Sequence, residues 1–258
     1  MKIKSYQQDL LADQERLAAF NEAIKEKTKG IIYDLGSGTG VFASLAASQA
    51  KKIYAIEKDP VTAALAKINL VNFENISLVI KDVKDVHFQE KADIIICEML
   101  DTALIDEEQV PILNFVRKFL KKTGEFIPCG VFNGVEVVSL DYTHICYQEE
   151  EKPSHQIISP LIIYDTIDFK EHIEEKVNIR LPISVNRDAM ASGIKISTFT
   201  ILTPHLICGP TPMLNPPLLI PTNNIKVTKG EKLILHLSYN MGGGLNTIRA
   251  EFEGISGK

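Results

Sequence analysis

A glycine-rich stretch is the clearest candidate for a binding site in this sequence. It reads Asp34-Leu35-Gly36-Ser37-Gly38-Thr39-Gly40 and lies between a predicted strand and a predicted helix. Glycines allow the backbone to turn tightly and allow a ligand to approach where a Cβ would otherwise stand. Glu57 ends the next predicted strand, at about the spacing at which an acid accepts hydrogen bonds from ribose hydroxyls. Together these features predict a nucleoside-binding loop.

The spacing of the glycines argues against two common nucleotide sites. A dinucleotide fingerprint requires a glycine at position 41, where this chain has Val41. A P-loop requires a Gly-Lys-Ser/Thr sequence, and none follows. The pattern Gly-x-Gly-x-Gly, with Asp34 two residues before the first glycine, instead fits a ligand that lacks a pyrophosphate.

A second candidate is the acidic segment 97–108, which holds five carboxylates in eleven residues from Glu98 onward. Such a segment suits a cationic substrate, and paired carboxylates suit a guanidinium, whose planar fork matches two oxygens. The alternative is that Asp106, Glu107 and Glu108 charge the N-terminus of the next helix, and this explanation is preferred for Asp106 and Glu108. Glu98 is different, because a carboxylate that ends a buried strand requires a partner.

Alternating helices and strands are predicted to position these residues. An amphipathic period over 5–28 predicts a first helix. Further helices are predicted over 41–50, 60–71 and 110–120, and short apolar runs predict strands over 31–35, 52–57, 76–80 and 93–97. Asp59 is placed to cap the second of these helices, with Pro60 at its first position. The alternation predicts an α/β fold, a Rossmann-like, doubly wound parallel sheet.

The pattern changes after Pro128 to consecutive strands separated by turns, which predicts a smaller, mostly antiparallel β-domain. We place the boundary near Gly130, giving domains 1–130 and 131–258. An acidic piece, 168–175, is compatible with a short helix. The strands predicted here cover residues 131–140, 155–163, 177–182, 193–202, 233–239 and 246–252.

The net charge, the length of the apolar runs and the cysteine spacing argue against several classes of protein. The formal net charge of −5 argues against a nucleic-acid binder, which needs a basic face. No apolar run approaches the length of about 18 residues that a membrane span needs, and no secretion signal follows the start. The four cysteines lack metal-binding spacing, so no metal site is expected and reduced thiols are the default. We expect a cytoplasmic protein.

Residues 31–40 and 54–59, with Asp82-Val83 after the third strand, resemble motif I and its neighbours in the class I S-adenosylmethionine-dependent methyltransferases. The resemblance implies S-adenosylmethionine as the cofactor. In that family the glycine-rich loop wraps the methionine portion, the acid at Glu57 binds the ribose and the region of Asp82-Val83 reads the adenine. The cofactor-binding residues that we predict are Arg16, Asp34, Gly36, Ser37, Gly38, Gly40, Glu57, Lys58, Asp82, Val83 and Glu98.

A narrower resemblance, to the protein arginine methyltransferases, covers about residues 9–130. Residues 94–99, with Glu107 nine positions after Glu98, resemble the double-glutamate loop that grips the substrate guanidinium in that family. Residues 13–16 resemble its pre-motif segment, whose arginine pairs with the cofactor carboxylate, and 124–128 resemble the exit into its β-barrel. The resemblance therefore implies a barrel-like second domain and assigns catalysis to Glu98 and Glu107.

The sequence departs from that family at two places. The Thr-His-Trp loop is expected near Pro212-Met213-Leu214, and none of its three residues is there. The spacing between Val177 and Leu202 leaves no room for the helical arm through which family members dimerise, so the oligomeric state stays open. The fold and the cofactor follow from the resemblance, whereas the arginine specificity does not.

Methyl transfer from a sulfonium is an in-line displacement, so much of the catalysis consists of holding the acceptor close and in line. An arginine has a pKa above about 12 and is not readily deprotonated beforehand, so a carboxylate pair would instead orient it. The predicted function is methylation of a cationic acceptor, most directly a protein arginine or a related nitrogen. The alternatives are a small-molecule or RNA methyltransferase on the same scaffold, or a non-catalytic methyltransferase-like binding subunit.

Overall fold

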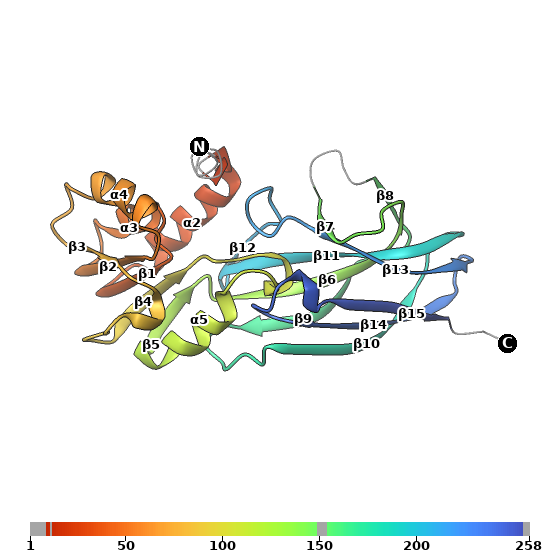
Figure 1. Ribbon diagram of the computed structural model, residues 1–258. Coiled ribbons are helices and arrows are strands. Elements are labelled where there is room, and N and C mark those ends of the chain that lie inside the picture. Colours follow the sequence, from red (N-terminus) through yellow and green to blue (C-terminus); the bar gives the residue numbers. More distant parts are fainter. Residues whose placement is uncertain (1–8, 11, 149–153, 255–258) are drawn as a thin grey trace.

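The computed structural model describes residues 9–10, 12–148 and 154–254 (Figure 1). The first half of the chain forms a parallel sheet with the strand order β3-β2-β1-β4-β5. This confirms the predicted α/β, doubly wound architecture. The strands of this sheet are β1 (Ile31–Leu35), β2 (Lys52–Glu57), β3 (Ile76–Ile80), β4 (Ala92–Cys97) and β5 (Leu120–Ile127).

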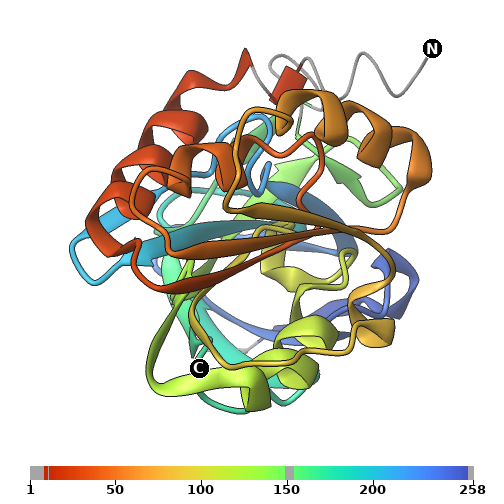
Figure 2. The same ribbon diagram turned by 90° about the vertical axis from the view of Figure 1, so that its left-hand side faces the viewer.

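Helices lie on both faces of the parallel sheet, α2, α3 and α4 on one face and α5 on the other (Figure 2). The central strands are therefore covered on both sides, which explains why β1 and β4 are almost continuously apolar. The helices are α2 (Gln14–Lys27), α3 (Val41–Ala46), α4 (Pro60–Asn69) and α5 (Gln109–Val116), with short 3₁₀ turns η1 (Val83–Asp85), η2 (Thr102–Leu104) and η3 (Arg117–Phe119).

Side-chain caps fix where two of the helices begin. The Asp13 carboxylate accepts a hydrogen bond from the backbone N–H of Arg16 (3.0 Å), and Asp59 accepts one from that of Thr62 (2.8 Å). The second cap, with Pro60 at the first helical position, is as predicted. The first begins α2 at residue 14. The sequence predicted one helix from residue 5, and residues 9, 10 and 12 are helical, but the helix is interrupted at Asp13. Residues 5–8 and 11 of that prediction lie outside the described residues.

The second half of the chain forms two antiparallel sheets, as predicted. One has the order β7-β13-β11-β6-β8, with β12 on β11 and β9 on β6, and the other has the order β10-β14-β15. Asn223 of β13 exchanges two hydrogen bonds with the backbone of Phe252 of β15 and so joins the two sheets. The elements are β6 (Gly130–Leu140), β7 (Cys146–Tyr147), β8 (His155–Ile157), β9 (Ile162–Asp168), β10 (Lys176–Ser184), β11 (Ala189–Thr203), β12 (Leu206–Cys208), β13 (Leu218–Val227), β14 (Lys232–Asn240), η4 (Leu245–Thr247) and β15 (Arg249–Gly254).

Two predictions for the second half were wrong. The acidic piece 168–175 is not a helix, because Phe169 is fully buried and the backbone of Ile173 is held at both its N–H and its C=O by Asn114. The single strand predicted over 155–163 is divided into β8 and β9 by Ser159-Pro160. In addition, strands β7, β12 and β13 were missed.

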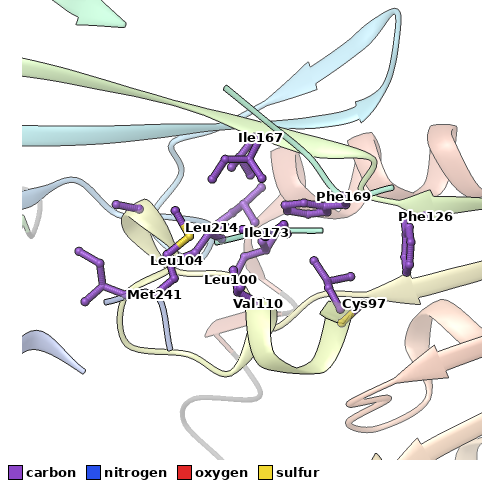
Figure 3. Packing of buried hydrophobic residues seen from close by; sticks show 14 of the residues in the cluster. Cys97, Leu100, Leu104, Val110, Phe126, Ile167, Phe169, Ile173, Leu214 and Met241 are labelled. Atoms are coloured by element: carbon purple, nitrogen blue, oxygen red, sulfur yellow. The ribbon is translucent and has the colours of Figure 1, made fainter. Parts of the chain in front are cut away.

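A large hydrophobic cluster runs through both halves of the molecule (Figure 3), and a second, small cluster holds Val138, Leu140 and Leu219. Leu100 and Leu104, from the acidic segment after β4, are buried in the same cluster as Ile173, Leu214 and Met241 from the second half. The sheet type changes between β5 and β6, close to the predicted boundary, and the division into domains 1–130 and 131–258 stays a prediction. Within the described ranges, no helix has the length and apolar character that crossing a membrane demands.

The junction of α3 with α4 gives a test of the packing. Gly40 caps α3 with φ at +86°, and a Cβ at this position would lie 2.8 Å from Cδ1 of the buried Leu70. We expect Gly40→Ala to lower the free energy of unfolding by about 2–4 kcal/mol, because the left-handed backbone and the clash both contribute. Urea unfolding of the cofactor-free protein measures the loss.

Gly230→Ala is the matched control, since Gly230 has a similar φ of +93° and nothing within 4 Å of the added Cβ. It should lose only about 1–2 kcal/mol, the backbone contribution. In a Leu70→Ala background the cost of Gly40→Ala should fall toward that of the control. Equal losses at the two glycines would show that contact with Leu70 does not constrain the turn.

Candidate active site

A cavity of about 540 Å³ lies at the carboxyl ends of the parallel strands. The segments that follow β1, β2, β3 and β4 all line it, at the place where the strand order reverses and open α/β sheets bind their ligands. Its volume is within the usual range for small-molecule and cofactor sites. Every site residue predicted from the sequence lines this cavity except Gly40, which caps α3 behind the turn.

The turn after β1 is folded around Asp34. This carboxylate is buried and accepts hydrogen bonds from the Ser37 hydroxyl (2.6 Å) and the Ala43 N–H (3.1 Å). It thereby holds the glycine-rich turn against the first residues of α3. Burial is the main reason why the pKa of Asp34 is raised to about 7, and the two hydrogen bonds offset it only in part.

Glu57 at the end of β2 ties the neighbouring turn in place. Its two carboxylate oxygens accept hydrogen bonds from the Gly38 N–H (2.9 Å) and the Asp59 N–H (2.8 Å), and the side chain stays largely buried at the cavity wall. Each carboxylate oxygen has two lone pairs, so Glu57 retains acceptor capacity toward a ligand that carries hydroxyl groups.

Arg16 reaches the cavity from the first turn of α2. Its guanidinium forms an ion pair with Glu98, lies 5.3 Å from the ring centre of Phe42, and is only 5 % exposed. Its Nε is buried and has no hydrogen-bond partner among the described residues. A buried, unsatisfied donor at a cavity wall is suited to an anionic group of a ligand.

Glu98 follows directly after β4, and its side chain is 13 % exposed. Burial raises the pKa of this carboxyl, and the Arg16 charge and hydrogen bond oppose the rise. The partner that a carboxylate at the end of a buried strand requires is thus an arginine from a helix 82 residues earlier in the chain.

Glu107 lies at the far end of the same acidic loop and also lines the cavity. Partial burial, followed by the nearby Asp106, raises its pKa. The fully buried Gln109 joins the two ends of this loop: its side-chain amide donates to the Cys97 carbonyl (2.9 Å) and accepts from the Met99 N–H (2.9 Å). Sequence reasoning did not single out Gln109, because its role depends on a closure that no local pattern reveals.

The rim of the cavity is charged. Glu108 stands at the N-cap position of α5, as preferred from the sequence, but within the described residues its side chain makes no capping bond and instead bridges Lys58 (3.1 Å) and Lys84 (3.3 Å). Asp82 caps η1 through the Lys84 N–H, and Val83 presents a buried apolar side chain to the cavity.

The segment expected to hold a Thr-His-Trp loop also reaches the cavity. Asp13 accepts hydrogen bonds from the Thr211 hydroxyl and from the Met213 N–H (3.2 Å), which fixes this segment of the second half to the start of α2. Met213 then contributes to the cavity wall. An apolar thioether therefore lines the wall here, which no pattern in the sequence indicated.

Known proteins resemble this chain in sequence and in fold. Residues 26–177 match a family profile described as a methyltransferase domain. An uncharacterised protein of Methanothermobacter thermautotrophicus is 44% identical over 250 residues, which cover 96% of this chain and 98% of that protein. A probable histone-arginine methyltransferase of Arabidopsis thaliana is 28% identical over 132 residues, 48% of this chain and 25% of that longer protein.

A solved structure, the Trypanosoma brucei PRMT1 enzyme–prozyme heterotetrameric complex with AdoHcy, superposes with a TM-score of 0.79. The match covers 96% of this chain and 93% of that one at 17% sequence identity, so it establishes a shared fold.

The buried Asp34 makes a prediction about pH. Its pKa rises from 3.8 in the unfolded chain to about 7, so the folded state binds the proton more tightly and stability falls as the pH rises from about 4 to 7. In Asp34→Asn the amide oxygen can accept both hydrogen bonds without ionising. We expect this variant to gain stability relative to the wild type between pH 5 and pH 8, on the order of 1–3 kcal/mol. Thermal unfolding of the cofactor-free protein at the two pH values measures it.

Asp59→Asn is the control of opposite sign. Its capping bonds lower the pKa of Asp59, so the stabilisation is present above the unfolded pKa and is lost only as the pH falls below about 4. This variant should therefore track the wild type between pH 5 and pH 8. A constant difference between Asp34→Asn and the wild type over this range would contradict an ionisation of Asp34 near pH 7.

Proposed function

Because the chain belongs to the methyltransferase domain family and is an S-adenosylmethionine-dependent methyltransferase, we propose that its acceptor is a cationic nitrogen, most directly the guanidinium of a protein arginine. The observation that carries this proposal is the placement of Glu98 and Glu107 on one loop that borders the cofactor cavity. Two carboxylates that face one cavity match the planar fork of a guanidinium. The partial sequence match to a probable histone-arginine methyltransferase supports the same acceptor.

The cavity residues fit S-adenosylmethionine. The buried, unsatisfied Nε of Arg16 is suited to the cofactor carboxylate, and the remaining lone pairs of Glu57 are suited to the ribose hydroxyls. The turn Gly36–Gly38 would bind the methionine portion, and Asp82-Val83 would bind the adenine. When bound, S-adenosylmethionine supplies an electrophilic methyl group on a sulfonium.

The work of the protein's own residues is orientation and proton transfer. Glu98 and Glu107 would bind two edges of the guanidinium, keep it cationic and direct one nitrogen toward the methyl donor. That nitrogen releases a proton as its new N–C bond forms. The raised pKa values of both glutamates make either of them a better proton acceptor than an ordinary glutamate.

One observation favours a second acceptor class. The segment that would carry Thr-His-Trp instead places Met213 in the cavity wall, so part of the usual arginine pocket is missing. A small-molecule amine is therefore the second candidate, and it requires the same orientation by Glu98. A non-catalytic role is set aside for two reasons. The chain belongs to the methyltransferase domain family, and its own predicted site residues, Gly40 excepted, line one cavity.

The acceptor is tested by incubating the purified protein with extract proteins and tritium-methyl S-adenosylmethionine. Acid hydrolysis and chromatography of the proteins should recover the label as methylarginine. Label that resists protease and passes a small-molecule filter would instead identify a small acceptor, and label in another amino acid would overturn the arginine assignment.

The role of Glu98 is tested by Glu98→Gln, which keeps the size of the side chain and a hydrogen bond to Arg16 but loses the charge. We expect the rate of methyl incorporation to fall by about 10²–10³-fold, because the acceptor cation loses a carboxylate that binds it and the proton released by the attacking nitrogen loses a carboxylate that can accept it. The Kd for S-adenosylmethionine, measured by calorimetry, should change less than about threefold. Glu253→Gln, on β15 and outside the cavity lining, is the control and should retain the wild-type rate. Retained turnover in Glu98→Gln would refute the role.

A further inference from the structure

Asp101 lies inside the acidic loop, between the two candidate catalytic glutamates, and is 6 % exposed. Three consecutive backbone N–H groups donate to its carboxylate: Ile105 (3.1 Å) and Asp106 (2.8 Å) to Oδ2, and Glu107 (3.1 Å) to Oδ1. The chain must curl around the carboxylate to bring these amides together. Ala103 and Leu104 form that curl with φ of 57° and 58°, a left-handed conformation that residues other than glycine rarely adopt.

The second half of the chain holds the middle of the loop but not its end. The Gly242 and Gly244 N–H groups donate to the carbonyls of Leu104 (2.8 Å) and Ile105 (2.9 Å), and the Thr198 hydroxyl accepts from the Ala103 N–H (2.7 Å). For the Glu107 N–H, the bond to Asp101 is the only one in the described part of the chain. Asp101 is therefore the direct hydrogen-bonded link between the fixed part of the loop and the backbone of Glu107.

A carboxylate is a costly residue for this position. No lysine or arginine of the described chain pairs with Asp101. The groups around it are Asp106 and Glu107 on its own loop, Tyr147 on β7, whose hydroxyl donates to Oδ2 (3.3 Å), and Tyr239 on β14. Burial raises its pKa to about 7: the hydrogen bonds from the Asp106 and Glu107 N–H groups oppose the rise, and the charges of the Glu107 and Asp106 side chains add to it. An apolar residue would avoid this cost but could not bind three amides.

We propose that Asp101 is a positioning residue that, through the backbone of Glu107, holds the Glu107 carboxylate toward the cavity and so completes the acceptor-binding pair with Glu98. This inference rests on the proposed cationic acceptor. It adds a residue that contacts neither cofactor nor acceptor and yet sets the affinity for the acceptor. Protonation of Asp101 turns one carboxylate oxygen into a hydroxyl and weakens the hydrogen bonds that the carboxylate accepts from the three amides, so binding of the acceptor weakens as the pH falls below about 7.

The test uses the full chain with S-adenosylhomocysteine bound and N-acetylarginine methylamide as the acceptor probe. Asp101→Asn keeps the shape of the side chain but loses the charged acceptor for the Glu107 N–H. The Kd of the probe at pH 8 should rise about tenfold or more, as for the loss of a hydrogen bond to a charged group, with the affinity for S-adenosylhomocysteine unchanged. Between pH 8 and pH 6 the wild-type affinity should fall toward that of the variant, whose own affinity should change less.

Hydrogen exchange at the Glu107 amide, followed by NMR, is the second measurement, and it needs no acceptor. Exchange should be faster in Asp101→Asn than in the wild type. Thr198→Val is the structural control, because it loosens the same loop at Ala103 without touching Glu107. It should lower the melting temperature and leave the Kd of the probe unchanged.

The possible results separate the two proposals. Unchanged probe affinity and unchanged Glu107 exchange in Asp101→Asn would overturn the role of Asp101 and leave the arginine acceptor intact. If the wild type does not bind the probe, the arginine acceptor fails, while faster Glu107 exchange in Asp101→Asn would still support the hold of Asp101 on Glu107. Equal losses of probe affinity in Asp101→Asn and Thr198→Val would reduce Asp101 to a structural residue and overturn the proposal.

Discussion

The architecture of the site depends on how carboxylates are kept at the carboxyl edge of the parallel sheet without being exposed to water. A buried acid requires hydrogen-bond donors. At Glu57 and Asp101 backbone amides supply them, and at Asp34 an amide and a hydroxyl do. Glu98 has a different solution, an ion pair with Arg16. The amides thus stabilise the acids that build the walls, whereas an arginine faces the acid proposed to act on the acceptor.

These contacts also give the loops their shape, because each one joins a side chain to backbone groups of another turn. Asp34 folds the glycine-rich turn against α3, and Glu57 links that turn to the start of α4. Asp101 curls the acidic loop until Glu107 returns to the cavity. The hydrogen bonds that stabilise the buried carboxylates are therefore the same hydrogen bonds that shape the loops around the cavity. Removing one of these bonds would change both the stability of the acid and the shape of the loop.

The sequence predicted the elements whose cause is local. Strands β1, β2 and β3 were predicted at the bounds observed, since each is a short, mostly apolar run between turn residues. Residues whose role requires closure over distance could not be found in this way. Gln109 is an ordinary polar residue near a helix start, and the strand β13 was obscured by Pro221, Asn223 and Asn224. The segment 168–175 is acidic like a helix surface, but its conformation is fixed by Asn114 and by burial of Phe169.

The two halves of the chain contribute to the site unequally. Every predicted cofactor contact comes from residues 16–98, in the helices, strands and connecting loops of the parallel-sheet half. The acidic loop, in contrast, is held by Pro216, Gly242 and Gly244, all from the second half. A change in the second half can therefore reshape the acceptor side while the cofactor side is preserved. That separation accounts for a resemblance to the arginine methyltransferases that is clear over residues 9–130 and fails at Pro212-Met213-Leu214. For the proposed acceptor, the same argument makes the second half, rather than the glutamates alone, the part of the chain on which specificity depends.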